Sequence, residues 1–454
     1  MVRLDRGAGA PLRAQLEEQL RAAVRSGRLA PGTALPSTRS LAGDLDVSRG
    51  VVVEAYAQLA AEGYLVGRQG APTRVSETAA RPAARGRPPA EERPPRFDFR
   101  PGAPDVSLFP RDAWAASLRR ALREAPDVRL DYGDARGAPE LRRALTAYLG
   151  RARGVACEAD GVIVTSGMAQ GMALVGRTML ARRKRRIGVE DPGSGPGRAQ
   201  LVATGLDPVP LPVDRDGLQT DALARAAADV VFVTPAHQFP TGVVLAPARR
   251  AALLEWAARA EALVMEDDYD AEYRYDRQPV GALQGLAPDR VIYAGSVSKT
   301  LAPALRLGWL VAPEHLVADL ARAKAQDDLG TPVMEQLALA DFLGRGGLDR
   351  HLRRTRLVYR RRRDALIAAV ERLLPGVRIA GVAAGLHLVA GLPEGTDDEA
   401  IVRAARRRGV GLQALAEHRL RRGPPALLLG YGRIAEPAIQ AGVRELAAAV
   451  GSRP

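Results

Sequence analysis

Near the start of the chain, apolar residues recur at every fourth position. This stripe predicts an amphipathic helix over residues 11–26, and its members are Leu12, Leu16, Leu20 and Val24. A proline and a glycine then interrupt the pattern. Two shorter helical patterns follow at 38–45 and 49–62, and Ser37 and Ser48 stand where each helix needs a capping hydroxyl. The chain therefore begins with three predicted helices joined by short turns.

Residues 63–76 contain two short apolar runs around a glycine-containing turn, which is the pattern of a β-hairpin. After two capped helices, such a hairpin predicts a winged helix-turn-helix, whose second helix enters the DNA major groove. The first residues of that helix face base edges, while nearby cations meet phosphates. The residues expected to contact DNA are Arg39, Ser48, Arg49, Gly50, Val51 and Arg68.

The composition changes twice after this hairpin. Residues 77–96 contain five prolines, several arginines and almost no large apolar residue, which predicts an extended linker. Its arginines either contact DNA phosphates or belong to a solvated spacer. From residue 97 the sequence is globular, so the predicted domains are 1–76 and 97–454, joined by the linker.

The larger domain alternates strand-like apolar runs with helical segments. This alternation predicts a mostly parallel sheet in an α/β domain, with strands in the runs 162–167, 187–190, 230–235, 262–268 and 290–296. In such sheets, ligands bind at the carboxyl ends of the strands. The polar residues that end these runs are therefore the candidates for a binding site.

The bulk composition narrows the class of protein. With 454 residues and 46% apolar content, the chain is long enough for two or three domains with buried cores. The net charge of +14 indicates a polyanionic partner, with nucleic acid favoured, although the arginine richness also fits a genomic coding bias. A single cysteine, Cys157, excludes intrachain disulfides and cysteine-based metal clusters. No apolar run approaches about 18 residues, so we expect a cytoplasmic protein without a membrane span.

Lysine is rare here, although cationic residues are abundant. Of 66 Lys and Arg residues, only three are lysines, at positions 184, 299 and 324. Arginine stays protonated, whereas a desolvated lysine can lose its proton and form a Schiff base with a carbonyl. Lys299 has phosphate ligands nearby in Ser296, Ser298 and Arg306. A lysine that holds an aldehyde, beside groups that hold a phosphate, describes a site for pyridoxal 5'-phosphate (PLP). The alternative is a solvated lysine on a polar loop.

Two other strand ends complete this candidate site. The run 162–167 leads into a helix at Gly167, Met168 and Ala169, where backbone amides are able to bind a phosphate. The run 262–268 ends near Asp267 and Tyr269, which suit a protonated pyridine nitrogen and a ring oxygen. Taken alone, the first feature also fits a tight turn without a ligand, and the second fits a solvated acidic loop.

The chain resembles a known family over almost its whole length. Residues 11–76, including STRSLAGDLDVSRGVVVEAYAQLAAEGYL, look like the winged-helix domain of the GntR superfamily. Residues 97–451 resemble fold type I PLP enzymes of the aspartate aminotransferase class, through LDYGDARGAPELRRAL, VEDPG, TPAHQFPTG, EDDYDAEYRY and SVSKTLAPALRLGW. The whole chain is thus similar to MocR-type regulators, in which a GntR domain precedes an aminotransferase-like domain.

The resemblance implies residue roles and partners. Lys299 is expected to carry the PLP aldimine, Asp267 to face the pyridine nitrogen and Tyr269 the ring hydroxyl. The 167–169 turn, with Ser296, Ser298 and Arg306, is expected to surround the phosphate. An amine or amino acid effector would displace Lys299 from PLP and change how two winged helices, in a homodimer, bind half-sites in double-stranded DNA.

The sequence departs from the family pattern at several positions. Gly50 and Val51 replace a usual polar pair, which predicts altered base readout. Ser194 stands where a tyrosine usually stacks on the cofactor, so we expect weaker PLP binding. Gln238 and Phe239 stand near the position of an aminotransferase asparagine, which counts against efficient transamination.

Three further features remain open on sequence grounds. The basic run 181–186 either contacts DNA or a partner, or is a solvated loop. Arg433 is a weak candidate for an effector carboxylate, and His387 either belongs to the site or packs within a strand. The leading function is a PLP-dependent transcriptional regulator; the alternatives are an active aminotransferase with an accessory DNA-binding domain, and a regulator with a cofactor-free sensor.

Overall fold

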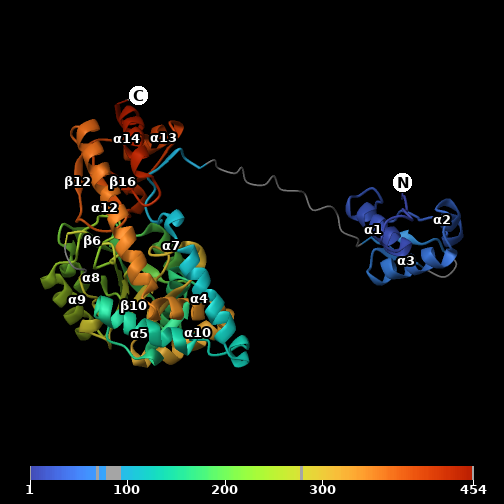
Figure 1. The fold of residues 1–454 in the computed structure, drawn as a ribbon, viewed down its shortest axis with the longest axis horizontal. Helices are drawn as coiled ribbons and strands as arrows, with labels where there is room; N and C mark the ends of the chain where they lie inside the picture. Colours follow the sequence, from blue (N-terminus) through green and yellow to red (C-terminus); the bar gives the residue numbers. More distant parts are fainter. Residues whose placement is uncertain (1, 68–70, 78–93, 277–279, 452–454) are drawn as a thin grey trace. The chain divides into compact units, whose positions relative to one another are not determined.

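The computed structural model describes residues 2–67, 71–77, 94–276 and 280–451. The chain divides into two compact units, Met1–Arg93 and Pro94–Pro454, each with its own fold (Figure 1). Arg68, predicted to contact DNA from the wing, and most of the predicted linker lie outside the described residues. Within the described residues, no helix is long and apolar enough to cross a membrane.

The first unit is a three-helix bundle with a short hairpin. Its elements are α1 (Leu12–Arg25), α2 (Thr38–Asp44), α3 (Arg49–Ala61), β1 (Leu65–Val66) and β2 (Arg74–Val75). The two strands pair antiparallel, with Leu65 opposite Val75. The core contains most of the predicted α1 stripe, namely Leu16, Leu20 and Val24, packed against α3 and the hairpin. The predicted winged helix-turn-helix is therefore confirmed.

The two predicted helix caps differ in outcome. The hydroxyl of Ser37 accepts a hydrogen bond from the Ser40 backbone amide, 3.1 Å away, and caps α2 as expected. Ser48 directly precedes α3, but its side chain makes no capping hydrogen bond, so the prediction that its hydroxyl caps α3 was wrong. Ser48 is exposed, and α3 instead begins with a backbone bond from Val51 N to Ser48 O.

The second unit is built on a mixed sheet of eight strands in the order β4-β11-β10-β9-β8-β5-β6-β7. The strands are β4 (Val162–Thr165), β5 (Arg186–Asp191), β6 (Asp207–Asp214), β7 (Gly217–Leu218), β8 (Val230–Val233), β9 (Leu263–Asp267), β10 (Val291–Ser296) and β11 (Gly308–Val311). Every neighbouring pair from β10 to β6 is parallel, while β11 and β7 run antiparallel to their neighbours. All five predicted strand runs lie in this sheet, and they are apolar because both faces of the sheet are covered.

In the described part of the second unit, eleven helices cover its sheets, and the last two of them, α13 and α14, pack beside a smaller sheet nearer the C-terminus. The eleven helices are α4 (Arg111–Glu124), α5 (Pro139–Arg153), α6 (Met168–Ala181), α7 (Gly195–Ala203), α8 (Leu223–Ala226), α9 (Pro247–Arg259), α10 (Glu314–Asp328), α11 (Val333–Gly344), α12 (Gly347–Leu373), α13 (Asp398–Arg407) and α14 (Glu436–Gly451). Local sequence sets their ends: α5 starts with Pro139 in its first turn and stops at Gly154, which adopts a left-handed conformation (φ 67°).

A smaller antiparallel sheet lies towards the C-terminus of the chain. It has the order β12-β13-β16-β15, from strands β12 (Arg378–Ala380), β13 (His387–Gly391), β15 (Gln413–Ala414) and β16 (Ala426–Gly430). A two-stranded pair joins β3 (Phe97–Asp98) to β14 (Val410–Gly411). The long helix α12 runs from the region of the large sheet to that of the smaller sheet (Figure 1).

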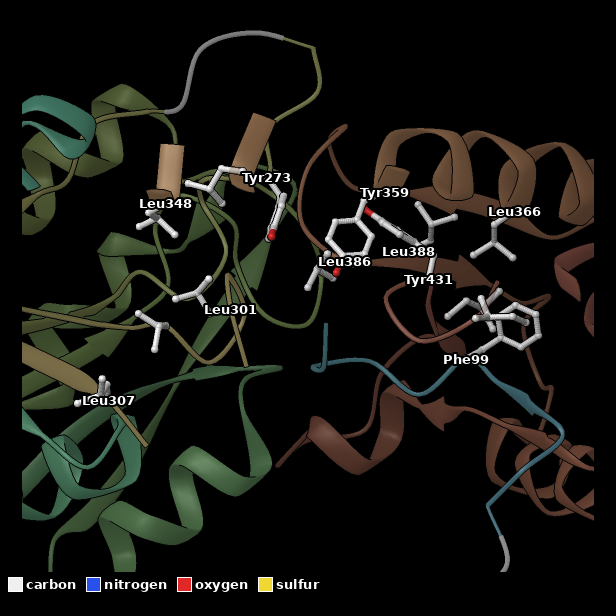
Figure 2. Packing of buried hydrophobic residues seen from close by; sticks show 14 of the residues in the cluster. Phe99, Tyr273, Leu301, Leu307, Leu348, Tyr359, Leu366, Leu386, Leu388 and Tyr431 are labelled. Atoms are coloured by element: carbon white, nitrogen blue, oxygen red, sulfur yellow. The ribbon is translucent and has the colours of Figure 1, made fainter. Parts of the chain in front are cut away.

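One apolar cluster connects the two sheets. Figure 2 shows its members, from Leu301 and Leu307 beside the large sheet to Leu366 and Leu388 on α12 and β13. At its centre, the ring of Tyr273 meets that of Tyr359 edge to face, with centroids 5.1 Å apart. The two sheets therefore share a core, which holds the strand ends of the large sheet against the loops of the smaller sheet.

Candidate cofactor site

The pairing of three strands brings the predicted phosphate ligands together. Strand β11 lies between β4 and β10, and its first residue, Gly308, pairs with both Thr165 and Ser296. A side chain at 308 would collide with the backbone, because a Cβ would lie 2.9 Å from the Gly167 Cα atom. The turn after β4 and the segment after β10 therefore meet at one edge of the sheet.

This edge forms a cradle suited to a phosphate. Gly167 precedes α6 with φ 98° and ψ 176°, so the amides of Met168 and Ala169 begin the helix. Arg306 is exposed, and its guanidinium donates to the carbonyl of Ser166. A Cβ at Gly167 would lie 2.8 Å from Arg306 Nη2, so only glycine leaves room for the guanidinium at this turn.

Two serines complete the same edge. Ser296 ends β10, and its hydroxyl oxygen lies 3.4 Å from the Ser298 backbone amide. Both side chains are half-buried. Hydroxyls, helix-terminal amides and a guanidinium are the groups that bind phosphates in proteins, so this donor set fits the phosphate of PLP.

Lys299 follows directly and is half-buried. Its ammonium donates to the carbonyl of Gly102, a residue whose positive φ (86°) favours glycine. Burial lowers the pKa of Lys299, while the charges of Asp267 and Asp270 raise it and that of Arg433 lowers it. The lowered pKa increases the neutral, nucleophilic fraction of the amine, as a lysine that forms a Schiff base requires.

Asp267 ends β9, next to the strand that leads to Lys299, and pairs there with Ala294. Burial and the neighbouring Asp268 raise the pKa of Asp267 to about 7, although the charge of Lys299 lowers it. Among the described residues, nothing donates a hydrogen bond to its carboxylate, whereas Asp268 is bound by Arg153 at 2.6 Å and by Tyr293 at 2.7 Å. Asp267 therefore forms no ion pair within the described residues, although the charge of Lys299 reaches it, and a protonated pyridine nitrogen fits that place.

Tyr269 lies beside two residues that sequence reasoning missed. Its hydroxyl is 3.0 Å from His237 Nδ1, and the same nitrogen is 3.0 Å from Asp270 Oδ1. Burial and the charges of Asp270 and Asp267 hold the pKa of Tyr269 well above its ordinary value. The side chain is therefore a neutral phenol that is able to donate its proton.

Five of the six predicted DNA-contacting residues are described, and they lie at the starts of α2 and α3. Arg39, Ser48, Arg49 and Gly50 are exposed, whereas Val51 is half-buried. Arg49 Nε lies 3.4 Å from the hydroxyl of Thr38, the first residue of α2, so the starts of both helices are tied together. This places the cations of α2 and α3 on neighbouring helix ends, as a major-groove reader requires.

Comparison with known proteins identifies the family. Residues 12–75 match the model of bacterial regulatory proteins of the gntR family, and residues 102–438 match that of aminotransferase class I and II. The chain is 36% identical to the probable rhizopine catabolism regulatory protein MocR of Rhizobium meliloti, over 99% of this chain and 96% of that protein. It is also 36% identical to the pyridoxine biosynthesis transcriptional regulator PdxR of Corynebacterium glutamicum, over 89% and 88% of the two chains.

The chain belongs to the MocR/PdxR-type transcriptional regulators. Its larger unit has the aminotransferase fold: it is similar to the Pyrococcus horikoshii kynurenine aminotransferase, with a TM-score of 0.72 and 27% identity, over 78% of this chain and 90% of that one. The cofactor of this MocR-type regulator is PLP. The lone carboxylate of Asp267, the cradle at Gly167 and the pKa of Lys299 fit that cofactor.

This MocR-type regulator has no aromatic side chain at position 194. Ser194 precedes α7, and its hydroxyl accepts a hydrogen bond from the Gly197 amide at 3.0 Å. The serine therefore caps a helix, which gives it a local structural role. An aromatic ring in this region comes from Phe239, which meets His418 edge to face with ring centroids 5.1 Å apart.

Gln238 is a structural residue of the large sheet's edge. Its amide donates to Pro192 O at 2.9 Å and Phe239 O at 2.7 Å, and its carbonyl accepts from the hydroxyl of Thr241 at 2.6 Å. The amide also lies 3.2 Å from the buried carboxyl of Glu190. These bonds fix the chain around Phe239, whose ring contacts Tyr269 and His387.

His387 packs within the protein, which supports the structural alternative. It begins β13, is buried, and donates from Nε2 to Pro240 O at 3.0 Å. Burial, with the nearby charge of His237, lowers the pKa of His387 to about 3, so the ring stays neutral. Three of the five histidines in the chain, at 237, 387 and 418, surround Tyr269 and Phe239, and this clustering is invisible from their spacing in the sequence.

Arg433 and the basic run 181–186 form ion pairs with carboxylates of the same unit. Arg433 forms an ion pair with Asp98 at 3.2 Å, yet remains 43% exposed and close enough to affect Lys299. In the basic run 181–186, three cations pair with carboxylates on neighbouring elements: Arg182 with Asp319, Lys184 with Asp229 and Arg185 with Asp207. This pairing favours the solvated-loop interpretation of the basic run.

Proposed function

We propose that this MocR-type regulator senses PLP, or an amine or amino acid that reacts with PLP at Lys299, and that the reaction changes DNA binding. One observation carries the proposal: the amine of Lys299 is half-buried next to Ser298 and against the carbonyl of Gly102. Burial there lowers the pKa of the amine, and the charges of Asp267 and Arg433 act on it. A lysine in these surroundings is suited to exchange a covalent partner with an incoming amine.

Each residue of the site has a defined task in this proposal. Bound PLP supplies an aldehyde that reacts with amines and an electron-withdrawing ring. Lys299 holds the cofactor, and Asp267 keeps a proton on its ring nitrogen. Tyr269 donates to its ring oxygen, and Gly167, Met168, Ala169, Ser296, Ser298 and Arg306 bind its phosphate. Arg433 is exposed enough to exchange Asp98 for an effector carboxylate.

The proposal includes a homodimer, which an exposed apolar surface supports. Val128, Tyr132 and Leu329 are all more than half exposed and line one surface depression. Exposed apolar groups that cluster in this way mark interaction sites. A Leu329→Asp substitution is expected to shift the protein towards a monomer in sedimentation experiments, and an unchanged dimer would exclude this surface as the interface.

The same surface is connected to the phosphate cradle. Gln170 accepts a hydrogen bond from the Ser166 amide at 2.8 Å and donates to Asp328, next to Leu329, at 2.8 Å. Lys324 is fully buried, and its ammonium binds Asp328 at 2.6 Å. These bonds form a continuous path along which a shift at the cradle would reach the proposed interface. A dimer holds two winged helices for paired half-sites.

DNA recognition in this proposal rests on the first unit. Arg39 contacts phosphates, as does Arg68 of the wing; Ser48, Arg49, Gly50 and Val51 face the bases. Gly50 has no side chain and Val51 is half-buried, so Arg49 carries most of the direct readout. Arg49→Ala is expected to relax sequence preference, whereas Arg39→Ala is expected to weaken binding to all sequences alike.

The decisive experiment joins the cofactor to DNA binding. PLP-loaded protein selects duplexes from a genomic fragment library, and its affinity for a selected duplex is measured with and without each amine that changes its visible spectrum. Lys299→Ala is compared with Lys184→Ala, which removes an exposed lysine paired with Asp229. We expect an amine-dependent change in affinity for wild type and Lys184→Ala, and none for Lys299→Ala.

Other outcomes identify the alternatives. Repeated turnover of an amino donor and an oxo acid, without an effect on DNA affinity, would establish an active aminotransferase instead. A protein that takes up no PLP, yet selects a duplex, would be a regulator with a cofactor-free sensor. Because phosphate contacts release counterions, specific DNA binding should also weaken steeply as salt concentration rises.

A further inference from the structure

His237 and Asp270 form a buried pair behind the proposed ring-oxygen donor, Tyr269. Nδ1 of His237 lies 3.0 and 3.1 Å from the two oxygens of Asp270, and 3.0 Å from the Tyr269 hydroxyl. Both side chains of the pair are only 2% exposed. The histidine follows β8 and the aspartate follows β9, so two adjacent parallel strands deliver them.

The ionised carboxylate of Asp270 determines which of His237, Asp270 and Tyr269 donate and accept hydrogen bonds. An ionised carboxylate only accepts hydrogen bonds, so Nδ1 of His237 must carry the proton that Asp270 binds. The Tyr269 oxygen therefore meets an N–H group and not a lone pair. It is able to accept from that group, and its own hydroxyl proton has to point elsewhere.

A glycine seals the pair from solvent. Gly385 has φ 71°, and a Cβ there would lie 2.2 Å from His237 Cε1 and 2.5 Å from Asp270 Oδ2. The carbonyl of Gly385 accepts from Tyr431 Oη at 2.6 Å and from Tyr275 Oη at 2.7 Å, which fixes this loop. A buried ion pair is weak evidence for stability, because desolvation offsets the attraction. Its position against Tyr269 indicates a role in the site.

We propose that His237 and Asp270 are positioning residues, which aim the Tyr269 hydroxyl proton at the ring oxygen of PLP. This inference rests on the proposed function, in which Tyr269 faces that oxygen. With the proton aimed outward, the phenol stabilises a negative ring oxygen. Without Asp270, Nδ1 of His237 is free to lose its proton; the phenol is then able to donate to this nitrogen, and the ring oxygen loses its donor.

Two substitutions at position 237 separate this role from simple packing. The side-chain nitrogen of asparagine takes the place of His Nδ1, while that of glutamine takes the place of Nε2. His237→Asn therefore keeps a donor between Asp270 and Tyr269, and His237→Gln removes it. Both variants are made in wild type and in a Tyr269→Phe background, and all are loaded with PLP.

The measurement is the pH midpoint at which the visible band of bound PLP changes. His237→Gln is expected to raise this midpoint by about one pH unit, because a hydrogen bond to a charged oxygen is lost. His237→Asn is expected to stay close to wild type. In the Tyr269→Phe background, which itself raises the midpoint, His237→Gln should add nothing.

The Asp270→Asn variant tests the direction in which the pH midpoint shifts. Loss of its negative charge alone lowers the midpoint, because that charge favours a protonated Lys299. Loss of the Tyr269 orientation raises the midpoint, so a higher midpoint in Asp270→Asn than in wild type supports the proposal. An equal shift for His237→Asn and His237→Gln, an additive effect with Tyr269→Phe, or a fall with Asp270→Asn would overturn it. If wild type shows no PLP band, the proposed function itself fails; a normal wild-type band with unchanged variants overturns only the positioning role.

Discussion

At the proposed phosphate end of the site, the available groups are backbone amides, hydroxyls and the exposed guanidinium of Arg306. At the ring end, they are ionisable side chains packed against other ionisable side chains: Asp267 and Tyr269 lie among Glu190, His237, Asp270 and Lys299. The first end comes from two short turns after β4 and β10. The second draws on the carboxyl ends of β5 and β9 and on the turns after β8, β9 and β10.

This difference separates affinity from reactivity. Amides, hydroxyls and a guanidinium keep their state across the physiological pH range, so the phosphate end provides constant attraction for an anion. At the ring end, burial raises the pKa of Asp267 to about 7 and lowers that of Lys299. Protonation there depends on pH and on the bound ligand. We therefore expect substitutions at the phosphate end to change PLP affinity, and substitutions at the ring end to change its chemistry.

The largest effect is expected from Asp267→Asn. Without the carboxylate, the ring nitrogen of PLP loses its counter-charge, and the rate at which an amine changes the visible spectrum should fall by about 100-fold or more. PLP should still bind. Stopped-flow absorbance measures this rate, with Asp289→Asn, an exposed aspartate beside Arg290, as the control. A wild-type rate in Asp267→Asn would contradict the assignment of Asp267 to the ring end.

Arg306→Ala should weaken PLP binding and leave the chemistry of the bound cofactor unchanged. Loss of a charge-assisted hydrogen bond to the phosphate is expected to weaken PLP binding by about 10- to 100-fold, with the pH midpoint of the bound cofactor unchanged. Equilibrium titration with PLP measures the affinity. Arg322→Ala removes an exposed arginine paired with Asp319 and serves as the matched control. A shifted midpoint with unchanged affinity would place Arg306 at the ring end.

Glu190→Gln tests the pH dependence of the ring end. Burial raises the pKa of Glu190 to about 7, so the folded state holds this proton more tightly than the unfolded state does. Its stabilising contribution is complete below the ordinary value of 4.5 and is lost as pH rises through about 7. Between pH 6 and pH 8 this loss is on the order of 1 kcal/mol. Urea unfolding of the PLP-free protein should show a shallower decline in Glu190→Gln than in wild type; an identical decline would contradict the shift.

The smallest effect concerns Ser194. Ser194→Tyr adds a ring at the position where the sequence pattern predicts stacking on PLP, and should strengthen PLP binding by up to about tenfold. It should also destabilise the fold by about 1 kcal/mol, because the cap of α7 is lost. Ser194→Ala loses the same cap without adding a ring. Calorimetry of both variants separates the effects, and equal PLP affinities would show that no ring stacks at this position.

Local patterns in the sequence predicted the strands whose ends form the proposed phosphate end. Alternation of strands and helices predicted all five strand runs, and the polar residues after β4 and β10 meet at Gly308. Strand order follows from the fold, so segments that end neighbouring strands converge. The winged helix was also predictable, because its helices and hairpin are adjacent in the chain.

The support of the ring end was not predictable in this way. His237 and Asp270 are 33 residues apart, and nothing in either local pattern shows that they meet. The sequence context of Gln238 counts against efficient transamination, but it does not show that the Gln238 amide donates to the backbone carbonyls of Pro192 and Phe239. Ser48 has the sequence context of a cap, but its hydroxyl does not bond to α3. Side-chain orientation depends on packing between distant segments, which a local pattern does not encode.

We propose that PLP is bound covalently to Lys299. Borohydride reduction of the PLP-loaded protein, followed by trypsin digestion and mass spectrometry, tests it directly. With only three lysines in the chain, the position of the pyridoxyl group is unambiguous. The account predicts this group on the peptide 291–306, which contains Lys299. A pyridoxyl group on Lys184 or Lys324, or on no peptide at all, would contradict it.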